Sequence, residues 1–207
     1  MRKITINLAA VAAFCIVVAS PALVSSSCAT PKTEQEDTTI IREDSGITAL
    51  KYSSPEVPAS IEFCGKTIDL SRFDRHERMD RELLAFTYMH STSLQMLKKA
   101  NRYFPIVEPI LKENGIPYDF KYLMVIESNM NPTARSSAGA AGLWQFMQGT
   151  GRDYGLEVNN NVDERYHIEK ATRAACRYLK DAYAKYKDWV AVAASYNAGQ
   201  APTARPL

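Results

Sequence analysis

One glutamate in the middle of the chain occupies a position that suits acid–base chemistry. Glu127 follows the apolar residues Phe120, Leu123 and Met124 at spacings of seven, four and three. In an α-helix these spacings place all four side chains on one face, which normally packs into the core. A carboxyl group among apolar neighbours has a raised pKa, so it donates a proton near neutral pH. The alternative is that Glu127 ends its helix and turns to solvent.

The residues that follow Glu127 are suited to line a sugar-binding surface. Gly139 and Gly142 allow the backbone to approach a ligand or another segment closely. An apolar wall and one amide come next, in the residues Leu143, Trp144, Gln145, Phe146 and Met147. The other interpretation is a packed turn, and for Trp144, as for Trp189, we favour a place in the core.

Two ordered motifs make the chain resemble the soluble lytic transglycosylase (SLT) domain family, whose fold is related to goose-type lysozyme. The first motif is matched by Glu127, Ser128, Pro132, Ala134, Ser136, Gly139, Ala140, Gly142, Leu143, Gln145 and Met147. The second is matched by Ala194, Tyr196, Asn197, Ala198 and Gly199. Tyr154-Gly155-Leu156 and Asp163-Glu164-Arg165 also fit. The resemblance covers residues 62–199 and is closest to the membrane-bound lytic murein transglycosylase D group.

The resemblance implies a peptidoglycan lyase in which Glu127 is the single catalytic residue. Glu127 would protonate the oxygen between N-acetylmuramic acid and N-acetylglucosamine, and would then take the proton of the muramic acid C6 hydroxyl. That hydroxyl attacks the anomeric carbon and leaves a 1,6-anhydromuramoyl end. An intramolecular nucleophile has a high effective molarity, so the second carboxylate of ordinary glycosidases is not required.

The resemblance also assigns substrate-binding roles to five residues and requires no cofactor. Ser136 would bond to the substrate near the N-acetyl group or to Glu127, and Gln145 and Met147 would line the glycan groove. Tyr196 would bond to Glu127 or the glycan, and Asn197 would hold the local backbone. A plain loop or helix-end hydrogen bond is an equal alternative for Ser136 and Asn197. No metal site is expected, because the histidines His76, His90 and His167 lack a paired ligand spacing.

Two other functions remain open. One is a non-catalytic peptidoglycan-binding protein that keeps the groove without the activity. The other is a lysozyme-type hydrolase, which needs a second carboxylate across the cleft from Glu127. Asp163 and Glu164 are the nearest candidates in the sequence, and we expect both to be structural.

The elements that position these residues are predicted to be helices, so the fold class is all-α and lysozyme-like. An extended segment is predicted at residues 60–70, before an amphipathic helix from Arg75 that divides into two pieces near His90. A new helix is predicted to start at Pro105 and end at Asn114-Gly115, and another to open at Pro117. The last two are predicted from Ile168 and from Trp189, with Asp188 as the cap of the final helix and Gly199 as its end.

The first residues have the order of a secretory signal peptide. Arg2 and Lys3 precede an apolar run from Ile4 to Val18, which is shorter than the roughly 20 residues of a spanning helix. We therefore favour a signal peptide at residues 1–27 over a membrane anchor. Cys28 then stands where a lipoprotein would be processed, although Ser25 replaces the usual leucine; a lipidated protein and a simply secreted one are equally open.

The rest of the chain is predicted to form a tether at 28–60, a transglycosylase domain at 61–200 and an irregular, truncated tail at 201–207. In the 207-residue chain 46 % of residues are hydrophobic and 23 % are charged, as in ordinary globular proteins. Without residues 1–27, 23 basic residues face 23 acidic ones, and this neutrality speaks against nucleic-acid partners.

Cys64 and Cys176 are either a disulfide or, as we favour, ordinary core residues. Gln148 replaces the family's usual proline, and the short tail puts activity in doubt.

Overall fold

A β-hairpin lies near the start of the part of the chain that the structure describes. The computed structural model describes residues 55–198, apart from the side chains of Asn197 and Ala198. Strands β1 (Ser60–Phe63) and β2 (Lys66–Asp69) pair antiparallel with Ile61 opposite Ile68, and the chain reverses through Cys64 and Gly65, both at positive φ. The extended segment predicted at residues 60–70 is therefore confirmed.

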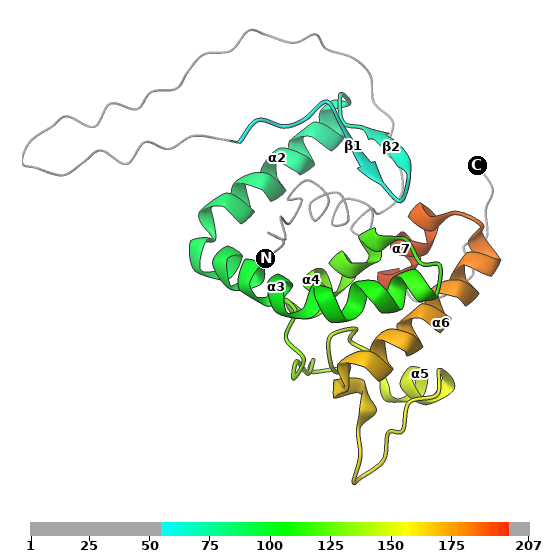
Figure 1. Cartoon of the computed structure of the whole chain (residues 1–207). Coiled ribbons are helices and arrows are strands. Elements are labelled where there is room, and N and C mark those ends of the chain that lie inside the picture. The colour runs from blue at the N-terminus through cyan, green and yellow to red at the C-terminus, as the bar shows by residue number, and fades with distance from the viewer. Residues whose placement is uncertain (1–54, 199–207) are drawn as a thin grey trace, which may run out of the picture.

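Two long helices follow the hairpin and meet at an elbow (Figure 1). They are α2 (Phe73–Tyr88) and α3 (His90–Glu113), separated by Met89 alone, so the predicted break near His90 is confirmed. The predicted helix start at Pro105 is wrong, because α3 continues through Pro105 and Pro109. Both prolines lie on the exposed face, and the opposite face is fixed by burial of Phe104, Val107, Ile110 and Leu111.

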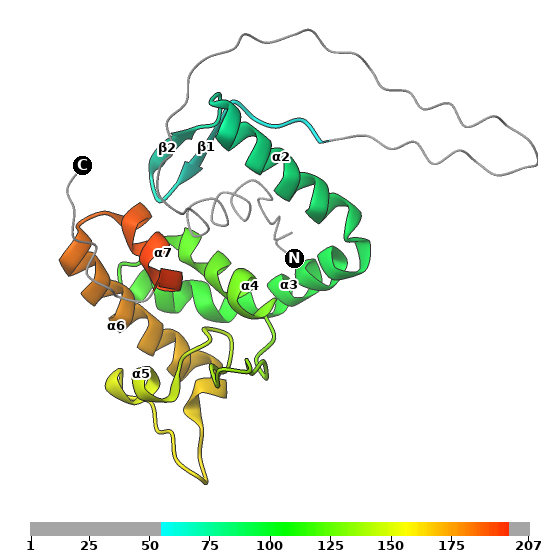
Figure 2. The same cartoon turned by 180° about the vertical axis from the view of Figure 1, so that it is seen from behind.

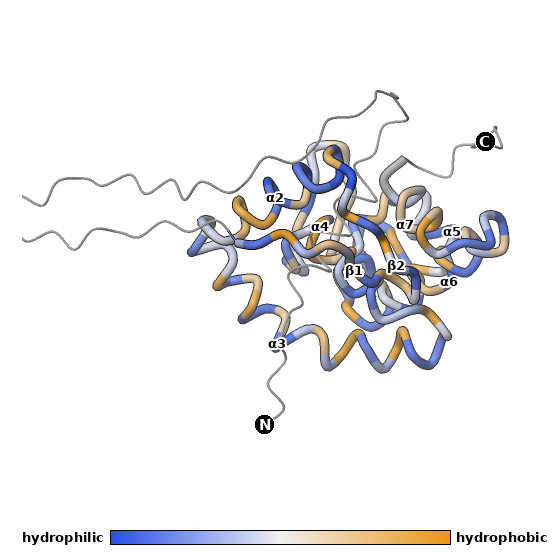
Figure 3. Tube along the Cα trace, turned by 90° about the horizontal axis from the view of Figure 1, so that it is seen from above, coloured by the Kyte–Doolittle hydropathy of each residue, from blue (hydrophilic) through white to orange (hydrophobic). Residues whose placement is uncertain are grey.

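The amphipathic face of α2 and α3 is less buried than its pattern predicts. Met79, Leu83 and Ala100 are buried, but Leu84, Leu94 and Leu97 are 40 %, 59 % and 37 % exposed. Figure 3 shows hydrophobic and hydrophilic stretches alternating along α3. Sequence periodicity therefore predicted that this region is helical but overestimated how much of its apolar surface packs.

The segment that carries Glu127 is two short helices instead of the single helix predicted from Pro117. A 3₁₀ helix, η1 (Tyr118–Tyr122), leads directly into α4 (Leu123–Ser128). The predicted stop before them is confirmed: Asn114 is the C-cap of α3, and Gly115 has a φ of 69°. A 3₁₀ turn has three residues per turn, so Phe120 is not on the ideal α-helical face of Glu127, although it is fully buried.

The C-terminal half of the described chain completes a mostly helical fold. Its elements are α5 (Gln148–Asp153), η2 (Glu164–Tyr166), α6 (Ile168–Tyr186) and α7 (Trp189–Ala198). The helix predicted from Ile168 is confirmed, and so is the cap of the last one, because the Asp188 carboxylate accepts a hydrogen bond from the Val190 amide at 2.9 Å. The predicted helical fold class is confirmed as well.

Two apolar clusters stabilise this arrangement. The large one joins α3, η1, α4, α6 and α7 around residues such as Phe104, Met124, Trp144 and Leu179. The small one lies between the hairpin and α2 and consists of Ile61, Leu70, Met79 and Leu83. In Figure 1 and Figure 2, α6 lies against α3 and α7, while α2 extends away from them beside the hairpin.

Several predictions fall on residues that the structure does not describe. These are the signal peptide at residues 1–27, Cys28 with nearly all of the tether, the end of the last helix at Gly199 and the tail at 201–207. Within residues 55–198, no helix combines the length and the apolar character that crossing a membrane requires.

Candidate active site

Glu127 lies in the last turn of α4 and is partly buried. The residues three and four positions before it, Met124 and Leu123, are fully buried. Burial raises the pKa of the Glu127 carboxyl from 4.5 to about 7. A carboxyl group with this pKa is protonated in a large fraction of molecules at neutral pH, and it ionises readily once the proton is used.

The end of α4 is held firmly, which fixes the position of Glu127. The Ser128 hydroxyl lies 3.0 Å from two carbonyl oxygens, those of Met124 in its own helix and Leu143 in the following loop. Asn129 and Met130 then take positive φ values of 48° and 52°, and the Met130 amide donates to the Met124 carbonyl at 3.0 Å. The serine after the glutamate therefore connects the helix to the loop that faces it.

Tyr196 on α7 lies close to Glu127. Its hydroxyl donates to the Trp144 carbonyl at 2.9 Å, and its ring packs edge-on against Tyr178 with centroids 5.2 Å apart. Burial, and then the nearby Glu127 carboxylate, raise the pKa of the Tyr196 hydroxyl well above 10. The structure thus brings together two residues that are 69 positions apart in the sequence, and Tyr196 stays a neutral hydrogen-bonding group.

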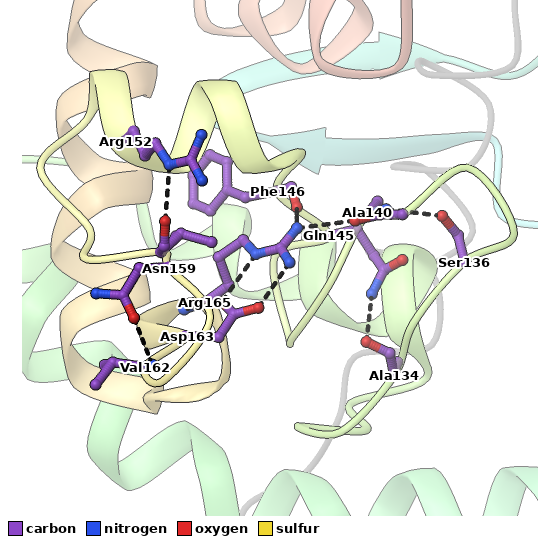
Figure 4. A network of polar contacts seen from close by, with 12 residues as sticks. Ala134, Ser136, Ala140, Gln145, Phe146, Arg152, Asn159, Val162, Asp163 and Arg165 are labelled. Atoms are coloured by element: carbon purple, nitrogen blue, oxygen red, sulfur yellow. Dashed lines mark hydrogen bonds and ion pairs between the residues drawn. The ribbon is translucent and has the colours of Figure 1, made fainter.

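The loop between α4 and α5 contains Gln145 and Ser136, and both make hydrogen bonds within it (Figure 4). Gln145 has a φ of 48°, and its amide nitrogen donates to the Gly142 carbonyl at 2.8 Å and to the Ala134 carbonyl at 3.3 Å. The Ser136 hydroxyl accepts from the Ala140 amide at 3.0 Å. The plain loop hydrogen bond, which was the alternative to a substrate contact for Ser136, is therefore present, and Gln145 bonds within the loop as well.

A buried arginine that the sequence did not single out organises this loop. Arg165 is 2 % exposed and forms a 2.7 Å ion pair with Asp163. It also donates to the Gly139 carbonyl at 2.8 Å and the Phe146 carbonyl at 2.9 Å (Figure 4). Because both ends of the glycine-containing segment bond to one guanidinium group, Arg165 sets the shape of the surface beside Glu127. The sequence contained one indication of this role, because Arg165 belongs to the Asp163-Glu164-Arg165 segment that fits the family pattern.

The other predicted residues are placed as follows. Met147 is 46 % exposed at the start of α5, and Asn197 belongs to α7, with a side chain outside the description. Trp144 is fully buried, and its indole nitrogen donates to the Thr172 hydroxyl at 3.0 Å, as expected for a core residue. Trp189 is partly buried and stacks on Tyr183 with centroids 4.1 Å apart.

Asp163 and Glu164 have structural partners. The Arg165 guanidinium holds the pKa of the Asp163 carboxyl below its usual value. The Glu157 amide and the Lys170 ammonium do the same for Glu164. Both carboxylates are thus stabilised in the charged form, which does not donate protons.

Cys64 and Cys176 are free thiols, so the disulfide alternative is wrong. Within residues 55–198, no group of three or more His, Cys, Asp and Glu is arranged to hold a metal ion.

Comparison with known proteins agrees with the motif positions. Residues 105–207 match the family model of the transglycosylase SLT domain. Membrane-bound lytic murein transglycosylase D from Escherichia coli strains K12 and O6:H1 is 31 % identical over 125 residues, which cover 60 % of this chain and 27 % of that protein. Peptidoglycan transglycosylase gp16 of Escherichia phage T7 is 33 % identical over 96 residues, 45 % of this chain and 7 % of that protein.

The matched region contains every residue of the site described above. It begins inside α3 and includes α4 with Glu127, the loop held by Arg165, and α7 with Tyr196. The chain spans only about a quarter of the length of its E. coli relatives. With the helical fold and both motifs in place, the chain from Pro105 onward belongs to the transglycosylase SLT domain family.

Proposed function

We propose that the chain is a peptidoglycan lytic transglycosylase that cleaves the β-1,4 bond between N-acetylmuramic acid and N-acetylglucosamine and forms a 1,6-anhydromuramoyl end. The observation that carries the proposal is the raised pKa of Glu127, about 7, in the SLT motif. The names of the E. coli and phage relatives, a murein and a peptidoglycan transglycosylase, support the choice of substrate.

In the proposed reaction Glu127 acts first as an acid and then as a base. Its proton goes to the glycosidic oxygen, which leaves with N-acetylglucosamine. The C6 hydroxyl oxygen of the muramic acid forms the new bond to the anomeric carbon, and the hydroxyl proton passes to the Glu127 carboxylate. The carboxyl group is then protonated again, so the cycle closes without water or a cofactor. A pKa near the working pH suits both roles.

A single carboxyl group is consistent with the surroundings of Glu127. Burial is the cause of its raised pKa, whereas a second carboxylate within a few ångströms would add a repulsive contribution. Asp163 and Glu164, the candidates for a lysozyme-type partner, are held by Arg165 and Lys170. An internal nucleophile from the substrate removes the need for such a partner.

The remaining site residues are proposed to bind the glycan. Tyr196 would orient Glu127 or a sugar, and Asn197 would hold the backbone beside it. Gln145 and Met147 would line the groove, since Met147 is exposed. Ser136 accepts one bond from Ala140, but a hydroxyl also has its own proton to donate, and we propose that this proton reaches the N-acetyl region of the substrate.

The test is digestion of purified peptidoglycan sacculi by the full chain, with mass spectrometry of the products. We expect 1,6-anhydro ends from the wild type and a loss of rate of about 10²–10⁴-fold with Glu127→Gln, the usual contribution of a general acid. Gln148→Ala, on the exposed side of α5, is the control and should keep the activity. Reducing ends would indicate a hydrolase, and no cleavage by folded wild type would indicate a binding protein.

We also propose that the protein is exported to the cell envelope and attached to a membrane through Cys28. The signal-like order of residues 1–27 and the membrane-bound E. coli relative support this location. Cells that express the chain would be grown with a radiolabelled fatty acid. Label in the wild type and none in Cys28→Ser is expected, whereas equal label in both would contradict lipid attachment at this residue.

A further inference from the structure

A small polar pocket lies directly beside the end of the Glu127 helix. It has a volume of about 270 Å³, several times the roughly 30 Å³ share of one water molecule in the liquid. One wall comes from α3 and the other from the residues that follow Glu127. The pocket is lined by Thr92, Gln95, Met96, Lys99, Ser128, Asn129 and Asn131. None of the functions assigned above uses its α3 wall.

The pocket offers hydrogen bonds and one positive charge. Gln95, Asn129 and Asn131 provide side-chain amides, Thr92 provides a hydroxyl, and none of the lining residues is acidic. The Lys99 ammonium donates to the Asn129 carbonyl at 2.9 Å, and this bond holds it beside the pocket. An ammonium group has three donors, so donors remain for a ligand.

No carboxylate neutralises Lys99 among the residues that the structure describes. The contrast is a larger cavity of about 590 Å³ on another stretch of α3, where Lys121 is ion-paired with Glu108 at 2.7 Å. A lysine held by a carbonyl, surrounded by amides and without an acidic partner, favours an anionic ligand with peptide-like hydrogen-bonding groups.

We infer that this pocket binds the peptide stem of peptidoglycan, with a stem carboxylate against Lys99. The inference rests on the proposed function, and it adds that the enzyme binds the peptide part of the substrate as well as the glycan. The stem is attached to muramic acid, the sugar whose bond Glu127 would protonate, so it must lie near Glu127. The pocket begins at Ser128, the next residue. Stem peptides carry carboxylates and amides, which match the lining.

The experiment compares two soluble substrates, glycan strands with intact stems and the same strands stripped of stems by an amidase. The measured quantity is the ratio of kcat/KM for the two substrates, with the full chain as enzyme. We expect the wild type to prefer stem-bearing strands by about two- to fivefold, the usual value of one charge-assisted contact at a solvent-accessible site. Lys99→Met should abolish this preference, and Lys99→Glu should reverse it. The matched control is Lys98→Met, an exposed neighbour that does not line the pocket, and it should keep the wild-type ratio.

The possible outcomes separate the pocket from the activity. If Lys99→Met slows both substrates equally, the lysine only supports the end of α4, and the stem assignment is overturned. A wild type without preference overturns it as well. If no anhydro ends form from either substrate, the proposed function fails, and the pocket is judged by equilibrium binding of Glu127→Gln to the two kinds of strand. The stem assignment is supported if the Glu127→Gln variant binds stem-bearing strands more tightly and if adding Lys99→Met removes this difference. Equal binding to both kinds of strand overturns the assignment.

Discussion

Glu127 combines two conditions that oppose each other in most proteins. Its carboxyl group is shielded enough for the pKa to rise to about 7, yet the residue stays partly exposed. The apolar residues Leu123 and Met124 provide the shielding, and Ser128 prevents the helix end from opening. An acid in these surroundings is most useful near neutral pH, where both of its protonation states are accessible.

The pH dependence of the reaction follows from this pKa. In the proposed reaction, the first step needs the protonated form of Glu127, which predominates below its pKa of about 7. We expect kcat/KM for anhydro-product formation to fall about tenfold for each pH unit well above 7. The rate would be measured on sacculi from pH 5 to pH 9. The residual rate of Glu127→Gln should show no such decline; the same decline in that variant would assign the pH dependence to another group.

The same group is predicted to make the folded protein less stable as the pH rises. The pKa of Glu127 is about 7 when folded and 4.5 as its ordinary value, so between these values the folded state binds more protons and the free energy of unfolding falls with pH. One pKa unit corresponds to about 1.4 kcal/mol. Because the carboxyl is only partly buried, water screens part of this effect, and we expect a loss of about 1–2 kcal/mol.

Denaturant unfolding of wild type and Glu127→Gln at pH 4 and pH 8 measures this loss. Glutamine does not ionise, so the variant should gain stability relative to the wild type by about 1–2 kcal/mol between the two pH values. A constant difference between the two proteins would show that the carboxyl is not shielded in the folded state.

At the scale of elements, the loop between α4 and α5 depends on one glycine. Gly142 has a φ of 78°, and a Cβ atom built there would lie 1.9 Å from the Arg165 carbonyl oxygen. Gly142→Ala should therefore shift the loop and lower the free energy of unfolding by about 2–4 kcal/mol, measured by denaturant unfolding. Gly149→Ala in α5 is the control, since its Cβ would meet nothing within 4 Å, and helix propensity makes it neutral or slightly stabilising. If the two variants change the free energy of unfolding equally, the loop accommodates a Cβ atom at Gly142 without strain.

Sequence periodicity and capping rules predicted most elements but not the contacts between them. The breaks at His90 and Gly115 and the cap at Asp188 depend on local chemistry, so they were predictable. Pro105 was misread because a proline lowers the local propensity for helix, while the burial of Phe104 and Val107 that outweighs it is a tertiary effect.

The candidate site shows the same division between local and distant information. The spacing of Leu123 and Met124 indicated Glu127 as a candidate, and the resemblance to the family motif identified it. Its nearness to Tyr196, and the bonds of Arg165 to Gly139 and Phe146, join residues far apart in the sequence. These pairings depend on how the helices pack, and a single sequence does not specify that packing without a known family to compare it with.

At the scale of the whole molecule, the hairpin connects two apolar clusters of unequal size. Phe63 packs in the large cluster beside Phe120, with ring centroids 6.4 Å apart. Ile61, two residues earlier on the same face of β1, packs in the small one with Met79 and Leu83. The small cluster holds α2, while Glu127 and Tyr196 depend on the large one. The helix α2 should therefore open more easily than the elements that form the site.

Hydrogen exchange of the native protein tests this difference. We expect the amides of α2 to exchange through a partial opening, and those of α6 only through more global unfolding. Met79 is fully buried in the small cluster, so Met79→Ala should weaken the protection of α2 by the cost of a buried methionine, about 2–4 kcal/mol, and leave α6 nearly unchanged. Leu84→Ala, at a side chain that is 40 % exposed, should cost less than about 1 kcal/mol. An equal loss of protection in α2 and α6 would instead show that the hairpin couples the two clusters into one cooperative unit, with the site no more stable than α2.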